Sequence, residues 1–415
     1  MQKSSQKLVL VCCLCLISSF SSLFGQNLPS LLTNKNINAT FSIVAYDESR
    51  QEWGIAVATN NIYVGNSTIY IKPGLGAFSV IAETEPDYAL NGFEQLQKGK
   101  TIKEAILFTK KADKAAHYRQ VSGLDKQGNA FAFTGEALKY WNGKSSHLMG
   151  NKFVVMGNQL DEKVLETIAT TYQNAKGTLA QRLLKSLVAG QTAGGQIHGK
   201  QSAALVVKGS KNRWFNQIDL RVDHSKAPFK ELQRLLNYHY GRIMLNQATY
   251  ALRAGNQKRA TNKLHKAEKL LTGWNGMYSK IALVNSLFGN NDQAAQWVLK
   301  ALKENEQWRV NLPAFYYLRK HPSLQHLIKP ETFTTKNWEQ AIAMFLRLGQ
   351  AKNAQTLANK ILSQGKSSSY LYYLLGKSEA RLNQPLKAKA ALQKAITLDS
   401  DNVEARKLLT DLTKK

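Results

Sequence analysis

The pattern of apolar and polar positions changes its character near residue 240 of the 415-residue chain. Before that point, short runs rich in β-branched and aromatic residues predict strands. These runs are TFSIVAY (40–46), WGIAVAT (53–59), KFVVMG (152–157), SAALVV (202–207), IDLRV (218–222) and a hairpin over 121–135 that turns around Lys126–Asn129. Helical periodicity occupies the segments near 86–98, 101–112, 160–173, 177–189 and 227–239. Strands and paired helices in this order indicate layered α+β packing.

Beyond residue 241 the strand signals stop, and apolar positions recur with a 34-residue period. The aligned columns hold Ala260, Ala294, Ala354 and Ala388, and four residues further on Leu264, Val298, Ala358 and Leu392. Small residues in fixed columns let the two helices of a repeat approach closely, and this spacing resembles the tetratricopeptide repeat. We therefore expect an all-α tetratricopeptide-like helical solenoid over 241–415, with four repeats and a capping helix. A generic helical bundle is the alternative.

The period of the repeats is interrupted once. An offset of 26 residues near 309–334 separates the second copy from the third, and it contains the segment LRKHPSLQHLI (318–328). This segment predicts a short helical insertion between the two copies.

The N-terminal segment has the pattern of a secretory signal peptide. Lys3 and Lys7 precede an apolar run over 8–20, and Gly25 is the best candidate for the position before a cut. The run is too short to span a bilayer, and a buried strand or an N-terminal anchor is the alternative. All three Cys residues lie within the first twenty positions, so removal of 1–25 leaves a Cys-free chain. This composition suits the periplasm or the exterior of a bacterium.

Charge is distributed unevenly along the chain. The formal net charge is +28, and residues 241–415 hold 28 basic and 11 acidic residues, against 25 and 17 in residues 40–240. A basic repeat region is able to attract an anionic envelope polymer by long-range electrostatics, and the alternative is that these charges only solvate helix faces. Nucleic acid is disfavoured as a partner because no nucleic-acid motif is present. The scattered His residues form no metal motif, so we expect neither a metal nor another cofactor.

Four motifs of the first half occur in a characteristic order. They are TFSIVA (40–45), GNQL (157–160), GGQIHGKQSAAL (194–205) and DLRVD (219–223), the last followed by Pro228 and a helix. In this order and spacing they resemble the bacterial family called domain of unknown function 1028, over about 200 residues from Thr40 to Tyr240. The resemblance implies a fold similar to the N-terminal-nucleophile hydrolases, which is a four-layer αββα sandwich.

The resemblance also implies a chemistry. In N-terminal-nucleophile enzymes the first residue of the mature chain attacks an amide, and its free α-amine is the base. Thr40 is the nucleophile that this implies, and Asn158 an oxyanion donor or substrate contact. The residues implied to shape the substrate site are Gln201, Ser202, Asp219, Arg221 and Asp223. A cut after Gly25 leaves residues 26–39 as a linker or propeptide, so a free amine requires a second cut between Ala39 and Thr40.

Each of these assignments has a structural alternative. Thr40 could be an ordinary strand residue, and Asn158, placed at a strand-to-helix turn, could cap a helix. Arg221 could form a structural ion pair with Asp219 or Asp223. Gly194 and Gly195 could form an anion-binding nest or a simple turn. Gln196 and His198 stand where the family usually carries charged residues, so this chain could be altered or inactive.

Three functions remain open from the sequence. The first is a secreted amide-bond hydrolase whose repeat region docks a protein or peptide partner. The second is a non-catalytic envelope binding protein whose basic repeats hold a protein or an envelope polymer. The third is a structural or assembly protein of the cell surface that uses the repeats as a scaffold. Likeness in fold does not by itself decide between them.

Overall fold

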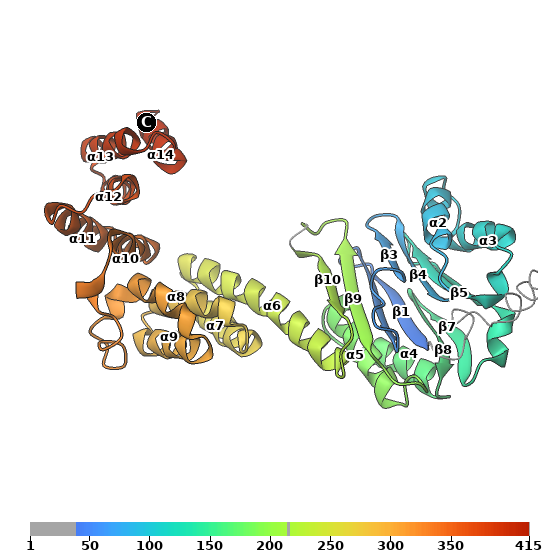
Figure 1. Cartoon of the computed structure of the whole chain (residues 1–415). Helices are drawn as coiled ribbons and strands as arrows, with labels where there is room; N and C mark the ends of the chain where they lie inside the picture. Colours follow the sequence, from blue (N-terminus) through green and yellow to red (C-terminus); the bar gives the residue numbers. More distant parts are fainter. Residues whose placement is uncertain (1–38, 214–215, 415) are drawn as a thin grey trace, which may run out of the picture. The chain divides into compact units, whose positions relative to one another are not determined.

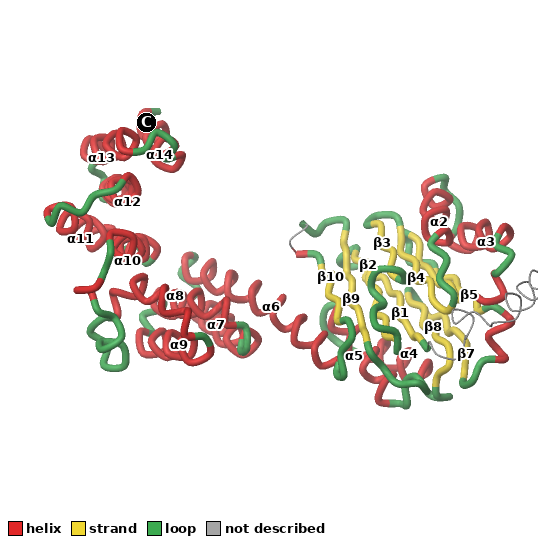
Figure 2. Tube along the Cα trace, in the orientation of Figure 1, coloured by secondary structure: helices red, strands yellow, loops and turns green. Residues whose placement is uncertain are grey.

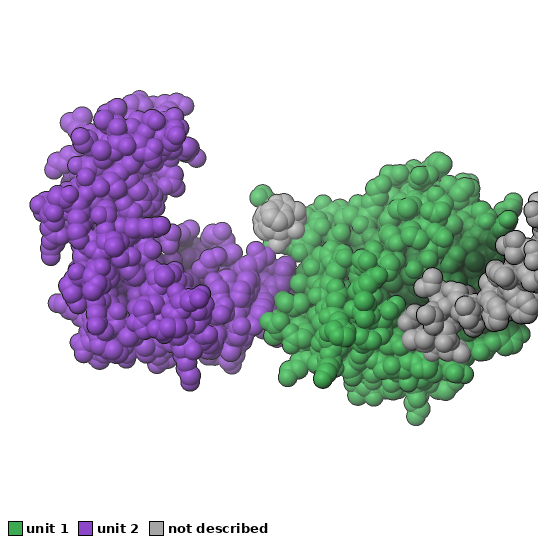
Figure 3. Space-filling view, in the orientation of Figure 1, with its two compact units in different colours: residues 1–236 green, residues 237–415 purple. Residues whose placement is uncertain are grey.

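A computed structural model describes residues 39–213 and 216–414 of the chain. The chain divides into two compact units, Met1–Leu236 and Asn237–Lys415 (Figure 3). The boundary falls within helix α6 (Pro228–Arg253). The expected signal peptide and the linker over 26–38 lie outside the described residues.

A six-stranded antiparallel sheet forms the centre of the first unit. Its strand order is β10-β9-β2-β1-β8-β7 (Figure 2). The strands are β1 (Thr40–Asp47), β2 (Glu52–Thr59), β7 (Lys144–Gly150), β8 (Phe153–Leu160), β9 (Ser202–Gly209) and β10 (Ile218–Val222). Helices α4 (Val164–Asn174) and α5 (Leu179–Thr192) pack against this sheet (Figure 1).

A four-stranded antiparallel sheet forms the second part of this unit. Its order is β3 (Ile69–Lys72), β4 (Gly76–Ala82), β5 (Arg119–Asp125) and β6 (Ala130–Thr134). Helices α2 (Asp87–Gln97) and α3 (Ile102–Ala112) pack on it around the buried Phe78, Tyr88 and Ile106. Short 3-10 helices, η2 (Ala116–Tyr118) and η3 (Glu136–Tyr140), flank the β5–β6 hairpin.

The two sheets contact each other through alternate residues of β1. Val44 packs with Ala77 and Leu124 of the second sheet, and Ser79 Oγ donates a hydrogen bond to Ser42 Oγ at 3.1 Å. Because successive strand residues point to opposite faces, Thr40 shares the face of Ser42 and Val44. The first residue of β1 therefore faces the second sheet.

The second unit consists of consecutive helix pairs. They are α6 with α7 (Gln257–Leu271), α8 (Tyr278–Leu287) with α9 (Asn291–Glu304), α10 (Thr335–Arg347) with α11 (Ala351–Ser363), α12 (Ser369–Arg381) with α13 (Pro385–Leu398), and a final α14 (Val403–Thr413). The aligned Ala260, Ala294, Ala354 and Ala388 are all fully buried. The expected helical repeat region is confirmed.

The insertion lies between α9 and α10, but the prediction of a helix over 318–328 is wrong, since residues 319–327 form turns and a bend. These turns connect the 3-10 helices η6 (Glu306–Leu318) and η7 (Pro330–Thr332), and another 3-10 helix, η5 (Asn275–Met277), precedes α8. Pro313 lies inside η6, and Phe315 interrupts its helical dihedral angles. A proline cannot donate the backbone hydrogen bond of an α-helix, so this segment does not extend the solenoid as a regular helix.

The sequence prediction failed at particular strands and ends. Strands β3, β4 and β7 were not predicted, and β8 runs on to Leu160, so that α4 begins only at Val164. Asn158 therefore lies inside a strand, and its interpretation as a helix cap at a strand-to-helix turn is wrong. Among the described residues, every helix is too short or too polar to cross a bilayer.

A close approach of α5 to β2 generates a prediction about stability. Gly54 has no side chain, and a Cβ there would lie 2.5 Å from Leu183 Cδ1 and 3.1 Å from Val207 Cγ2. Gly54→Val should therefore displace α5 and lower the free energy of unfolding by about 1–3 kcal/mol. Urea unfolding, with hydrogen exchange of α5 peptides, measures this loss. Unchanged protection of α5 would contradict the prediction, and Gly54→Ala should show a smaller loss.

Candidate functional site

Four polar residues form one row across the six-stranded sheet. Thr40 on β1 pairs with Asn158 on β8 and with Thr59 on β2, and Thr59 pairs with Ser202 on β9. Directly paired residues place their side chains on the same face of a sheet. Thr40 is 8% exposed, whereas Asn158 and Ser202 are fully buried. The strand register thus brings together three of the residues that the sequence singled out.

The peptide bond between Ala39 and Thr40 is held on both sides. Ala39 N donates to Asn60 Oδ1 at 2.8 Å, and Thr40 N donates to Asn158 Oδ1 at 3.1 Å. The carbonyl oxygen of Ala39 accepts two hydrogen bonds, from Thr59 Oγ1 at 2.8 Å and from Asn60 N at 3.3 Å. Two donors aimed at one carbonyl oxygen stabilise negative charge that develops there.

The direction of the hydrogen bond between the two threonine hydroxyls follows from the count of protons. Thr40 Oγ1 and Thr59 Oγ1 lie 2.9 Å apart. A hydroxyl has one proton to donate, and Thr59 donates its own to Ala39 O. Thr40 must therefore be the donor in this contact, with Thr59 as the acceptor.

A buried chain of amides fixes the orientation of Asn158. Gln120 Nε2 donates to Gly157 O at 2.8 Å and Ser146 O at 3.1 Å, so Gln120 turns its oxygen to Asn158 Nδ2 at 3.0 Å. Backbone groups at both ends of the chain decide which amide atom is oxygen. Asn158 thus presents an acceptor, not a donor, to Thr40 N.

The same chain ends at a histidine. Thr134 Oγ1 lies 3.0 Å from Gln120 Nε2, whose two protons are shared among this oxygen and the two carbonyl oxygens, and it lies 2.9 Å from His147 Nδ1. Burial lowers the pKa of His147. The imidazole is therefore neutral at neutral pH, and the network behind Thr40 carries no charge.

Gln201 connects this row to a cavity. Its Nε2 donates to Asn60 O at 2.8 Å, and its Oε1 lies 2.9 Å from His224 Nδ1. The cavity has a volume of about 370 Å³ and is lined by Ile62, Tyr63, Gly65, Asn66, Arg221, Asp223 and His224. Arg221 Nε donates to Asp219 Oδ1 at 2.9 Å, so this pair exists as an exposed ion pair. Asp219 does not line the cavity.

The glycine pair behaves as a turn. Gly194 and Gly195 have φ angles of +117° and +63°, and Gly195 N donates to Gly190 O. That amide is therefore satisfied within the protein. Gln196, which follows, is 3% exposed, and neither of its amide atoms has a hydrogen-bond partner among the described residues. Ser202 Oγ is likewise buried without a partner in this part of the chain.

Several residues of the site were not predicted from the sequence. They are Thr59, Asn60, Gln120, Thr134 and His147. Thr59 is the last residue of a predicted strand and Asn60 follows it, which is a weak indication of function, because only the strand register places them beside Thr40. Gln120 lies on the other sheet, and its local sequence gives no indication of a role in the site. No group of three or more metal-binding side chains occurs among the described residues.

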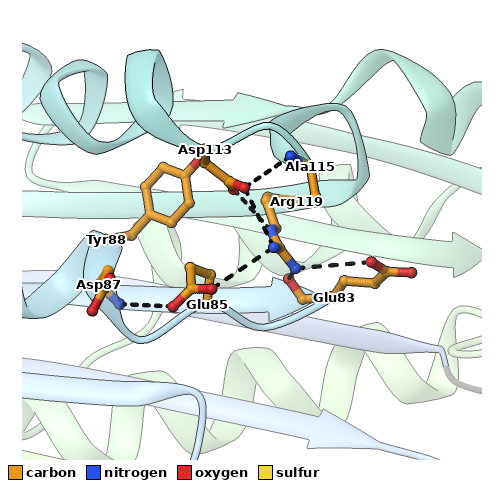
Figure 4. Close-up of polar contacts among 7 residues, drawn as sticks. All are labelled: Glu83, Glu85, Asp87, Tyr88, Asp113, Ala115 and Arg119. Atoms are coloured by element: carbon orange, nitrogen blue, oxygen red, sulfur yellow. Dashed lines mark hydrogen bonds and ion pairs between the residues drawn. The ribbon is translucent and has the colours of Figure 1, made fainter. Parts of the chain in front are cut away.

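An arginine surrounded by carboxylates anchors the end of β5 beside Gln120 (Figure 4). Arg119 Nε donates to Asp113 Oδ2 at 2.9 Å, and its other nitrogens lie 3.8 Å from carboxylate oxygens of Glu83 and Glu85. Burial of Asp113 opposes its ionisation, but hydrogen bonds from Arg119 and Ala115 N outweigh burial and hold its pKa below the usual range. This ion pair joins α3 to the strand that carries Gln120.

The low pKa of Asp113 generates a prediction about acid stability. The carboxylate stabilises the fold above its unfolded pKa of about 4, and this stabilisation is lost as the pH falls through the lower folded pKa. Asp113→Asn should lower the free energy of unfolding by about 2 kcal/mol at pH 7, with the difference shrinking toward pH 2. Urea unfolding with hydrogen exchange of β5 measures it. Asp219→Asn, in an exposed pair, is the control; a pH-independent loss for Asp113→Asn would contradict the prediction.

Comparisons with known proteins show that the first unit is similar to one protein family. Residues 40–232 match the model of a family described as "Family of unknown function (DUF1028)". This match confirms the resemblance seen in the four sequence motifs. A solved DUF1028 protein from Silicibacter pomeroyi is 27% identical, with 48% of this chain and 84% of that chain covered and a TM-score of 0.44.

Solved repeat proteins are similar to the chain at low identity. A tetratricopeptide repeat protein from Parabacteroides merdae is 15% identical, with 61% of this chain and all of that chain covered and a TM-score of 0.23. The tetratricopeptide domain of P58(IPK) is 13% identical, with 42% and 55% covered and a TM-score of 0.22. No curated protein matches the chain.

Proposed function

We propose that residues 40–240 form an amide-bond hydrolase of the N-terminal-nucleophile type, an αββα sandwich in which Thr40 is the nucleophile. One observation carries the proposal, which is the pair of donors on the carbonyl oxygen of Ala39, beside the hydroxyl of Thr40. We also propose that the chain is secreted and that its repeat region binds a protein partner.

The first step of the proposal is cleavage of the chain before Thr40. Thr40 Oγ1 attacks the carbonyl carbon of Ala39, and the oxyanion is stabilised by Thr59 Oγ1–H and Asn60 N–H. As the bond from Ala39 C to Thr40 N breaks, the hydroxyl proton passes to that nitrogen and an ester remains. Water then hydrolyses the ester, which leaves a carboxylate on Ala39 and a free α-amine on Thr40.

The second step is turnover of an external amide. In the uncut chain Asn158 Oδ1 accepts a hydrogen bond from the peptide N–H of Thr40 at 3.1 Å, so the new α-amine should lie beside the same oxygen. Held in this way, the amine takes the proton from Thr40 Oγ1 as general base. The acyl group of a substrate occupies the place of Ala39, so Thr59 Oγ1–H and Asn60 N–H stabilise its oxyanion as well. Asn158 is then a positioning residue for the amine, not an oxyanion donor.

A second function is supported by a separate observation. Ala39 and Thr40 are buried, and the amide and carbonyl groups of the peptide bond between them are hydrogen-bonded within the fold. An uncut chain held in this way has no free amine at Thr40. The alternative is therefore a non-catalytic envelope binding or assembly protein that uses the repeat region as a scaffold.

Replacement of the nucleophile tests the proposal. Thr40→Ala should remain uncut on incubation of the purified full chain, whereas Thr40→Ser should still be cut, because Ser supplies the same hydroxyl. Intact-mass spectrometry over time follows the cleavage. Ser42→Ala, which removes the next hydroxyl on the same face of β1, is the matched control and should be cut like the wild type. Cleavage of Thr40→Ala before residue 40 would exclude self-processing by Thr40.

Removal of one oxyanion donor gives a second test. Thr59→Val keeps the shape of the side chain but removes the hydroxyl that bonds to Ala39 O, so cleavage should slow by about 10²-fold. The rate is measured by the same mass assay. Thr68→Val is the control, since Thr68 is another buried threonine whose hydroxyl bonds to a backbone carbonyl, that of Val64. Equal rates in both variants would contradict the role of Thr59.

A further inference from the structure

We propose that the second unit binds the carboxylate groups of an acidic peptide in a pocket formed by the insertion between the second and third repeats. This inference goes beyond the hydrolase proposal and does not depend on Thr40. It concerns the point at which the 34-residue period is interrupted.

The pocket lies among the ends of four elements. It has a volume of about 560 Å³ and is lined by residues of α8, η6, α10 and α11, together with loop and helix-end residues next to them. The lining residues that matter for the argument are Tyr316, Tyr317, Arg319, Gln350, Asn353 and Lys360. Three of them come from the insertion, so a regular solenoid would lack this wall.

The insertion is fixed in place by its aromatic residues. Tyr317 Oη lies 2.7 Å from Ser286 Oγ, and burial raises the pKa of Tyr317 to about 12, so the phenol stays neutral. Tyr316 contacts Phe333 and Trp338 at ring-centroid distances of 6.2 and 5.2 Å. The wall that carries Arg319 is therefore packed against both neighbouring repeats.

The two charged residues that line the pocket, Arg319 and Lys360, are both cations. Arg319 is partly buried and stacks on the ring of Tyr316 at 4.2 Å, and its Nη1 donates to Tyr316 O. Within the described residues no carboxylate forms an ion pair with Arg319, and none lines the pocket. Lys360 adds a second cation from α11. Arg319 lines the pocket and uses only Nη1 in the hydrogen bond to Tyr316 O, and a planar guanidinium matches the two oxygens of a carboxylate.

The aromatic residues favour a peptide over a nucleic acid. Single-stranded nucleic acid needs open aromatic faces on which bases stack. Here the guanidinium of Arg319 covers the ring of Tyr316, and Phe333, Trp338 and Phe345 surround that ring.

The wall formed by α11 offers groups that suit a peptide backbone. It presents the amide side chains of Gln350 and Asn353, and Asn353 Nδ2 donates to Gln350 Oε1 at 2.9 Å. Amides both donate and accept, as peptide backbone groups require.

Fluorescence anisotropy with the full chain tests the proposal. The probe is a fluorescein-labelled peptide, Gly-Gly-Phe-Leu-Glu-Glu with a free C-terminus, compared with Gly-Gly-Phe-Leu-Gln-Gln carrying a C-terminal amide. The acidic probe should bind at least tenfold more tightly, because only it offers carboxylates to Arg319 and Lys360. Equal affinity for the two probes would overturn the proposal.

Single substitutions test whether the acidic probe binds in this pocket. Arg319→Gln and Lys360→Gln should each lower the affinity for the acidic probe, the first by about tenfold or more. Lys320→Gln should change this affinity by less than about twofold. Lys320 is exposed and does not line the pocket, so it is a matched control for net charge. Lys360 is exposed as well, so Lys360→Gln leaves the packing intact. It therefore tests the proposal even if Arg319→Gln disturbs the stacking on Tyr316.

Two results would contradict the assignment of the pocket. One is that Arg319→Gln and Lys360→Gln bind the acidic probe as Lys320→Gln does. The other is that a single-stranded oligonucleotide binds more tightly than the acidic peptide and loses affinity in Arg319→Gln, which would assign the pocket to nucleic acid.

Discussion

The hydroxyl of Thr59 is the interaction on which the candidate site depends. It donates to the carbonyl oxygen of Ala39 and accepts from the hydroxyl of Thr40, so one side chain connects the peptide bond to the nucleophile proposed to cut it. This arrangement exists only because β1 and β2 pair in a register that sets the two threonines opposite each other. A shift of one residue would turn Thr59 to the other face of the sheet.

The second sheet contributes by holding the first in position. Gln120 of β5 reaches Asn158 of β8 and the carbonyl of Gly157, so an uncharged, fully buried hydrogen-bond chain joins the two sheets directly behind Thr40. A buried polar network that is satisfied throughout gives a rigid, specific arrangement, whereas a missing partner costs stability. The ion pair of Arg119 with Asp113 stabilises the neighbouring end of β5. A nucleophile must approach the carbonyl carbon in a fixed direction, and a rigid network of this kind holds it there.

Much of the fold depends on contacts between residues close in the sequence and could be predicted, whereas most of the candidate site could not. The repeat period gave the helix pairs because each pair depends on contacts within about 34 residues. Strand β7 was missed because its residues are mostly polar and partly exposed, so the period-two pattern is weak. Thr40, Asn158 and Ser202 were found through motifs. Thr59 and Gln120 were not, because their importance arises from pairing across strands and sheets, which a linear pattern does not contain.

The proposed hydrolase requires that the chain is cut between Ala39 and Thr40. N-terminal sequencing with intact-mass measurement, on protein purified from its native host, shows whether this bond is cut. Self-processing predicts a mature chain that begins at Thr40. A chain that begins near Gln26, retains the Ala39–Thr40 bond and still hydrolyses amides would contradict it, because Thr40 would then have no free amine to act as base.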